Sequence, residues 1–294
     1  MLLLALACPV EFEVLGITTV AGNVPLDLTQ RNARIMCELA ERTDVPVYAG
    51  CEKPMRRRLM TAENVHGKTG SDGVEIYQPD MVLQDEHAVD FITETLLEAA
   101  ENSITLVPTG PLTNIGSAIK KQPAILSKIK EIVLMGGAMR EGGNTTPCAE
   151  FNILVDPDAA QIVMHCGRPL TIVPLDVTHQ ALVTQNRIAK IRALDTPVAT
   201  AVVGMMEFFN RFDSEKYGSE GAPLHDPCTI AYLLKPDLFK GKLCNVEVET
   251  ESPLTLGHTA VDFWAVTKRN RNANWLYQMD TDGFFALLLE RLNS

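Results

Sequence analysis

The sequence lacks the signatures of several protein classes. Its seven cysteines stand singly, with no C-x-x-C pair, and an odd number of scattered cysteines argues against a disulfide framework or a zinc site. No apolar run approaches the roughly 20 residues that a membrane-spanning helix needs. We therefore expect no membrane partner, and reduced thiols favour a cytoplasmic location.

Basic surface and phosphate-binding loops are also scarce. The formal net charge is −11, and no basic stripe with interleaved aromatic residues occurs, so we expect no nucleic-acid partner. We interpret the one basic run, Lys53–Arg58, as a solvated turn rather than a phosphate site. No G-x-G-x-x-G or Walker-type loop is present, which argues against a doubly wound enzyme with a nucleotide cofactor.

What the chain does contain is a regular alternation of β-branched runs with amphipathic stretches. The strand candidates are 14–20, 45–48, 104–107, 132–135, 170–174, 245–249 and 259–265, and the helix candidates are 28–41, 87–101, 112–129, 157–166, 185–193, 198–210, 227–234 and 283–292. This order predicts an α/β fold with an open, mostly parallel sheet flanked by helices. Without a linker or repeat, we expect a single domain over residues 1–294. The runs 104–107 and 132–135 are apolar on both faces, as central strands are.

The opening Met1–Cys8 is apolar, but no basic residue precedes it and acidic Glu11 and Glu13 follow. A signal peptide needs a positive start and a longer apolar run. We interpret the segment as the end of an amphipathic helix.

Polar residues follow four of the predicted strands. They are the groups Ala21–Asn23, Pro108–Asn114, Gly136–Asn152 and Leu175–His179. Ligands of such sheets bind beyond the carboxyl ends of the strands, and these groups offer neutral amides and a carboxylate, which suit sugar hydroxyls better than phosphates. Individually they could be turns, and Asn152 or Asp156 could simply cap the helix that begins near Pro157.

Two further segments allow more than one interpretation. In Leu224–Cys228, Asp226 could be a helix N-cap before Pro227, or His225 beside it could be a proton donor. The segment Asn64–Gly73 has the composition of a long mobile loop, which could be an active-site lid or an ordinary loop.

Together these residues resemble the nucleoside hydrolase family of the inosine–uridine type. The motifs that carry the resemblance occur in the family's order along the whole chain, and they are Gly16–Asn23, Val107–Asn114, Val133–Gly137, Ala149–Asn152 with Asp156–Pro157, and Leu224–Pro227. The resemblance implies hydrolysis of the N-glycosidic bond of ribonucleosides through an oxocarbenium-like transition state, with a bound calcium ion.

Carried over position by position, the resemblance also implies residue roles. The Thr109 carbonyl and the Asp226 carboxylate would bind calcium, and His225 would assist departure of the base. The substrate-binding residues would be Asn23, Asn144, Glu150 and Asn152 at the ribose hydroxyls, Met135 near the sugar, and His66 and Tyr217 near the base.

The segments His66–Gly73 and Glu215–Gly218 are most similar to those of pyrimidine-preferring members. The resemblance therefore implies uridine or cytidine as substrate, with inosine as a further possibility. It also implies a homo-oligomer, either a dimer or a tetramer.

One part of the family pattern is not found. The first strand of the family ends in a D-x-D-x-x-x-D-D motif that supplies calcium ligands and the general base, whereas the first aspartate here is Asp27. We therefore expect a fold without its first strand and an incomplete calcium site. Two explanations stay open: a trimmed or misassigned start of an active enzyme, or a non-catalytic nucleoside- or ribose-binding pseudoenzyme.

Overall fold

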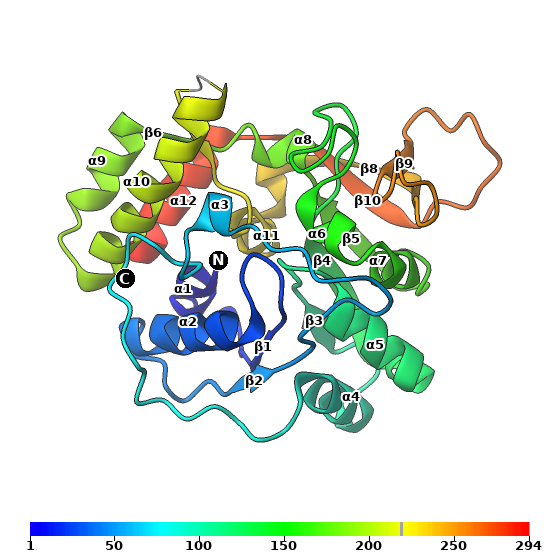
Figure 1. Cartoon of the computed structure of the whole chain (residues 1–294), viewed down its shortest axis with the longest axis horizontal. Helices are drawn as coiled ribbons and strands as arrows, with labels where there is room; N and C mark the ends of the chain where they lie inside the picture. Colours follow the sequence, from blue (N-terminus) through cyan, green and yellow to red (C-terminus); the bar gives the residue numbers. More distant parts are fainter. Residues whose placement is uncertain (218–219, 294) are drawn as a thin grey trace.

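The computed structural model describes residues 1–217 and 220–293, with only the backbone described for 212–217. Helices and strands alternate along most of this length (Figure 1). The strands are β1 (Ile17–Thr19), β2 (Val47–Ala49), β3 (Ile104–Leu106), β4 (Ile129–Met135), β5 (Leu170–Val173), β6 (Leu182–Thr184), β7 (Gly221–Pro223), β8 (Phe239–Val248), β9 (Thr259–Asp262) and β10 (Ala273–Met279). The helices are α1 (Leu2–Leu6), α2 (Leu26–Leu39), α3 (Glu63–His66), α4 (Ala88–Glu98), α5 (Thr113–Lys121), α6 (Phe151–Val155), α7 (Pro157–Met164), α8 (Leu175–Thr178), α9 (Gln185–Arg192), α10 (Pro197–Tyr217), α11 (Pro227–Leu234) and α12 (Thr281–Leu292), with 3₁₀ turns η1 (Pro123–Lys128) and η2 (Pro236–Leu238).

The largest sheet has six strands in the order β3-β4-β5-β10-β8-β9. Strands β3, β4, β5 and β10 run parallel, and β8 is antiparallel to both β10 and β9. Strands β1 and β2 form a separate parallel pair, and β6 and β7 an antiparallel one. The prediction of a mostly parallel sheet flanked by helices is confirmed.

Strand β4 explains why some strands are apolar on both faces. Ile132 and Leu134 point into one buried cluster, packed under α4, α5 and α7, while Val133 points into the other, packed under α9 to α12. Successive side chains of a strand face opposite sides of a sheet, so helices on both sides require apolar residues at every position.

The strands differ from the predictions in three respects. Strand β3 is an edge strand with half-buried residues rather than a covered central strand. Strand β10 was not predicted, because polar Asn274 and Gln278 interrupt its apolar pattern, although it lies in the middle of the sheet with Trp275 fully buried. Strands β6 and β7, of three residues each, were missed as well.

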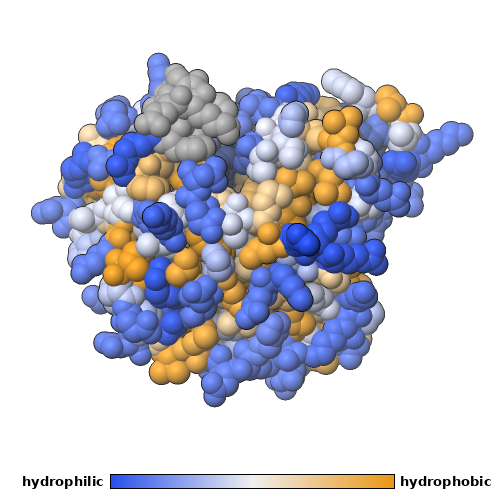
Figure 2. Space-filling model, viewed as in Figure 1, coloured by the Kyte–Doolittle hydropathy of each residue, from blue (hydrophilic) through white to orange (hydrophobic). Residues whose placement is uncertain are grey.

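The apolar start of the chain forms helix α1, as expected, with Leu3, Leu4 and Leu6 buried. Among the described residues, none of the helices combines the length and apolar character needed to cross a membrane. Hydrophilic side chains cover most of the face shown in Figure 2, and apolar residues show through across its middle.

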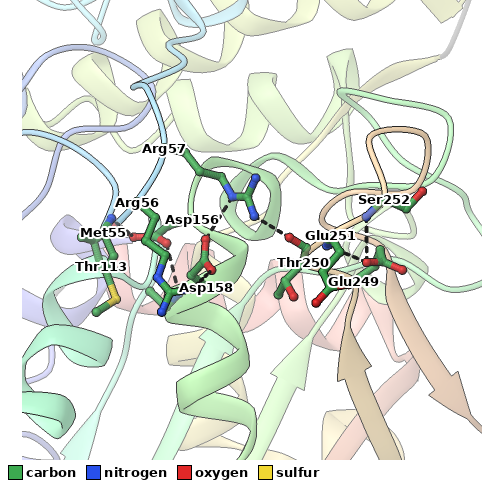
Figure 3. Close-up of polar contacts among 11 residues, drawn as sticks. Met55, Arg56, Arg57, Thr113, Asp156, Asp158, Glu249, Thr250, Glu251 and Ser252 are labelled. Atoms are coloured by element: carbon green, nitrogen blue, oxygen red, sulfur yellow. Dashed lines mark hydrogen bonds and ion pairs between the residues drawn. The ribbon is translucent and has the colours of Figure 1, made fainter.

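The basic run is more than a solvated turn. The Arg57 guanidinium pairs with Asp158 at 3.0 Å and donates to the Thr250 carbonyl at 2.5 Å (Figure 3). Arg56 is mostly exposed and lies 3.5 Å from the other oxygen of Asp158. The run therefore joins the segment after β2 to helix α7 and to the turn after β8.

Candidate active site

A cavity of about 1590 Å³ opens at the carboxyl ends of the parallel strands. Its walls come from the segments that follow β1, β3 and β4, from helix α10, and from the turn before α11. Nine of the ten expected site residues line it: Asn23, His66, Thr109, Met135, Asn144, Glu150, Asn152, His225 and Asp226. The tenth, Tyr217, ends α10 and its side chain lies outside the described residues.

Glu150 is buried and holds the start of helix α6. Its Oε1 accepts a hydrogen bond from the Asn152 amide at 2.9 Å, and its Oε2 accepts from the amides of Gly137 at 3.1 Å and Ile153 at 3.2 Å. A carboxylate has about four acceptor positions, so one remains for a ligand. Burial raises the pKa of Glu150 to about 7, against the opposite effect of these three amides.

Asn152 presents its amide oxygen to the cavity. Its Nδ2 donates to the carbonyls of Met135 at 3.1 Å and Thr109 at 3.3 Å, which end or follow neighbouring strands. The side chain is buried, and all three of its polar contacts with the protein, the third being to the Met135 Sδ at 3.4 Å, use the amide nitrogen. Its Oδ1 is therefore available to accept a bond from a bound hydroxyl.

The side-chain amide of Asn144 is oriented oppositely to that of Asn152. Its Oδ1 accepts from the Phe151 amide at 3.0 Å, which leaves its Nδ2 as the donor toward a ligand. Asn23 is fixed through its backbone, since its carbonyl accepts from the Ala62 amide at 2.8 Å. The side chains of the two asparagines thus reach one cavity from loops far apart in the sequence.

Asp226 occupies the N-cap position of α11, with Pro227 in the first turn, but its side chain makes no capping hydrogen bond. Asp226 is therefore at the predicted N-cap position, but its carboxylate does not cap the helix. Its carboxylate lies in the cavity wall, and burial raises its pKa to about 6, while the nearby Met1 amino group acts in the opposite direction. The other predicted helix cap, Asp156, does cap its helix: its Oδ1 accepts a hydrogen bond from the Ala159 amide of α7 at 3.0 Å.

His225 and His66 bring two imidazoles to the cavity. The Nδ1 of His225 lies 2.7 Å from the Thr178 hydroxyl. Burial, with smaller contributions from His179 and His66, lowers the pKa of His225 to about 3. Burial also lowers the pKa of His66 to about 4, and its ring lies 5.3 Å from that of Phe209. Both rings are therefore neutral at pH 7.

The segment Asn64–Gly73, expected to be a loop, begins with helix α3, which places His66 against α10. Gly73 packs so closely on the Gly204 carbonyl that a Cβ there would lie 2.3 Å from it. His66, Gly70 and Ser71 of this segment line the cavity, and α3 lies beside α10 (Figure 1).

Comparison with known proteins decides the family. Residues 1–286 match the family model of inosine-uridine preferring nucleoside hydrolases. The chain belongs to this family. It is 47% identical over 292 residues to the pyrimidine-specific ribonucleoside hydrolase RihA of Shewanella sp. (strain MR-7), covering 99% of this chain and 91% of that protein. It is also 47% identical over 290 residues to an uncharacterized protein of Schizosaccharomyces pombe, covering 99% and 93%.

Similar solved structures belong to nucleoside hydrolases as well. A purine-preferring ribonucleoside hydrolase from Gardnerella vaginalis superposes with a TM-score of 0.91 at 33% identity, over 99% of this chain and 93% of that one. A plant nucleoside hydrolase superposes with a TM-score of 0.92 at 29% identity, over 99% and 94%. This nucleoside hydrolase is therefore a hydrolase that acts on N-glycosyl compounds.

The residues that the chain offers for calcium do not complete a site. Calcium takes six to eight oxygen ligands, and of those implied by the family resemblance the cavity wall contains the Thr109 carbonyl and the Asp226 carboxylate. Among the side chains that the structure describes, those of residues 1–211 and 220–293, no three His, Cys, Asp or Glu side chains come together as a metal-binding group. The described residues alone therefore do not fit this ion, and we assign no step to it.

Sequence reasoning missed several residues of this nucleoside hydrolase cavity. Phe209 and its neighbours Met205 and Met206 line it from α10, and their helical spacing could have indicated a helix face turned toward the site. His179, from the predicted polar group Leu175–His179, also lies in the wall, with its Nδ1 3.0 Å from the Glu141 Oε2, although no role had been predicted for it. No local pattern could have indicated that Thr178 contacts His225, because 47 residues separate them.

Proposed function

We propose that this nucleoside hydrolase cleaves the N-glycosidic bond of ribonucleosides, with pyrimidine nucleosides preferred over purine nucleosides. The observation that carries the proposal is one cavity in which hydroxyl-binding side chains and two neutral imidazoles meet. In this reaction the C1′–N bond breaks with its electron pair passing to the base. Water adds its hydroxyl group to C1′ and its remaining proton to the base nitrogen.

The ribose is assigned to the part of the cavity around Glu150 and Asn152. The free acceptor position of Glu150 and the Oδ1 of Asn152 accept hydrogen bonds from sugar hydroxyls, while the Asn144 Nδ2 donates one. The side chain of Asn23 completes the set, and Met135 packs near the sugar. These groups match a neutral polyol, which needs both donors and acceptors.

The base is assigned to the part of the cavity around His66, Phe209 and His225. A flat aromatic base stacks favourably against rings such as those of His66 and Phe209. His225 hydrogen-bonds to the departing base, whose negative charge grows as the bond breaks. Tyr217, whose side chain lies outside the described residues, is assigned to the same part.

The pyrimidine preference rests on similarity. The relative named for pyrimidine specificity is 47% identical to this chain, whereas the purine-preferring structure is 33% identical. The segment His66–Gly73, part of which lines the cavity, has the form found in pyrimidine-preferring members. Uridine and cytidine are the proposed substrates.

A second candidate function is nucleoside or ribose binding without turnover. It is favoured by the lack, among the described residues, of a group of three side chains able to hold a metal. General-base help to a water is worth about 10²–10⁴ in rate, and a cavity that binds ribose without that help would bind the substrate but not cleave it.

One experiment separates the two candidates. The purified chain is incubated with uridine, cytidine and inosine, each with excess calcium and with chelator, and the free bases are measured by chromatography. Release of uracil and cytosine faster than hypoxanthine supports the proposal, and loss of that release with chelator supports calcium dependence. A folded chain that binds uridine in calorimetry but releases no base supports the binding function instead.

Two broader assignments are also proposals. All seven cysteines are free thiols, which supports a cytoplasmic location. The turn after β9 exposes Trp264 and Val266, at 75% and 84% of their surface, and large exposed apolar side chains favour an interface between copies in a homo-oligomer. Light scattering of the purified chain tests the oligomeric state.

A further inference from the structure

Thr178 is the last residue of α8, the single helical turn that follows β5. It is fully buried, and its hydroxyl lies 2.7 Å from the Nδ1 of His225. Such a distance is typical of a well-formed hydrogen bond to a hydroxyl. The contact joins the end of a core strand to the residue that we assign to the departing base.

The direction of this hydrogen bond follows from its surroundings. The carbonyl of Pro174, the usual acceptor four residues back in a helix, receives the backbone amide of Thr178. In the part of the chain that the structure describes, the Thr178 hydroxyl contacts no acceptor other than the His225 ring. A hydroxyl has a single proton to donate, so the Thr178 hydroxyl donates it to Nδ1.

An imidazole nitrogen that accepts a hydrogen bond carries no proton of its own. The proton of the neutral ring is then on Nε2, on the other side of the ring from Thr178. Since His225 lines the cavity, Nε2 is the nitrogen available to a ligand. The His225 ring therefore presents a hydrogen-bond donor, Nε2–H, to the cavity rather than an acceptor.

We propose that Thr178 is a positioning residue that holds His225 in the Nε2-protonated form, so that a donor faces the base of a bound nucleoside. This inference rests on the proposed function. The departing base accepts negative charge along with the electrons of the C1′–N bond, and a fixed donor stabilises that charge without reorganising during the reaction. The opposite tautomer would present a lone pair and repel the base.

The test measures the tautomer directly, without requiring turnover. The full chain is labelled with ¹⁵N in its histidines, and long-range proton–nitrogen NMR spectra are recorded at neutral pH, with the His225→Gln variant used to assign the His225 ring. In the wild-type chain we expect a protonated Nε2 and an unprotonated Nδ1. In Thr178→Val, which keeps the size of the side chain but removes the hydroxyl, we expect the Nδ1-protonated form to appear. Thr178→Ser should restore the wild-type spectrum.

A matched control is Thr171→Val, on the strand before α8. Thr171 is also buried, and its hydroxyl lies 3.5 Å from the Tyr232 hydroxyl rather than near an imidazole. This variant should leave the nitrogen shifts of His225 unchanged. A wild-type ring protonated at Nδ1, or the same spectrum in Thr178→Val as in the wild type, would overturn the inference.

Kinetics provide a second measurement. If the chain releases uracil, Thr178→Val should lower kcat by about tenfold to a hundredfold, the range found for hydrogen-bond partners that orient metal-ligating histidines, with a smaller change in KM. Loss of kcat with an unchanged tautomer would contradict the proposed role. If no variant, including the wild type, releases base, the proposed function fails while the NMR spectra still decide the tautomer.

Discussion

Replacing Asp156 by alanine should destabilise the chain strongly, because this fully buried side chain joins three segments (Figure 3). Its Oδ2 accepts hydrogen bonds from the Met55 amide at 2.9 Å and from the Thr113 hydroxyl at 2.7 Å. Its Oδ1 accepts from the Ala159 amide at 3.0 Å and so caps α7. Alanine removes both acceptor oxygens, and with them all three hydrogen bonds, and leaves the three donors in place.

The magnitude follows from these partners. Loss of a helix N-cap costs about 1 kcal/mol, and a buried donor left without a partner costs about 1–3 kcal/mol. The Thr113 hydroxyl is buried and the Met55 amide only partly so, so the second donor belongs at the low end of that range. We expect Asp156→Ala to lower the free energy of unfolding by about 3–5 kcal/mol, a large share of the 5–15 kcal/mol typical of a domain.

Urea unfolding followed by circular dichroism measures this change, with unchanged slopes taken as a sign that the same transition is compared. Asp156→Asn keeps one acceptor oxygen and should lose less than the alanine variant. Asp158→Ala is the matched control in the same helix. Its ion pairs with Arg56 and Arg57 reach the surface, and such pairs are worth about 1 kcal/mol or less. An Asp156→Ala chain no less stable than Asp158→Ala would refute the reasoning.

Three further predictions concern the cavity. His225→Gln should lower the rate of uracil release by about 10²–10³ with little change in KM, whereas equal effects on uridine binding and turnover would contradict its assigned role. Burial raises the pKa of Glu150 to about 7, so its ionised fraction grows about tenfold between pH 6 and pH 8. Ribose affinity, measured by calorimetry, should therefore rise with pH over this range, and a Glu150→Gln chain with the same pH dependence would exclude this carboxylate. Phe209→Ala should weaken uridine binding by about 0.5–1.5 kcal/mol through lost stacking and leave ribose binding unchanged; equal losses for both ligands would place the ring elsewhere.

Much of the fold could be predicted locally. Helix α11 was predicted with its exact bounds, since Pro227 starts it in the way typical of a first turn. Strand β5 was predicted to within one residue of its observed end, because its four residues are all apolar or β-branched, as suits a buried strand. Strand β10 could not be, because polar Asn274 and Gln278 interrupt its apolar pattern and only the sheet order places it between β5 and β8.

The candidate site divides in the same way. The motif residues Glu150 and Asn152 were identified from the sequence, but not that three backbone amides already occupy most of the Glu150 carboxylate. Nor could the motif show that the Asn152 amide is turned so that its oxygen is left for a ligand. These details depend on where neighbouring strands place their last carbonyls and amides.

The sequence by itself determined the family, the alternation of strands and helices, and the residue types gathered at the strand ends, since each of these is a pattern of neighbouring residues. Only the tertiary structure decided that the Asp226 carboxylate leaves its helix uncapped and that Thr178 meets His225. The physical reason is that a hydrogen bond needs its two atoms within about 3 Å. Between residues 47 positions apart, that distance is set by the packing of the whole sheet and its helices.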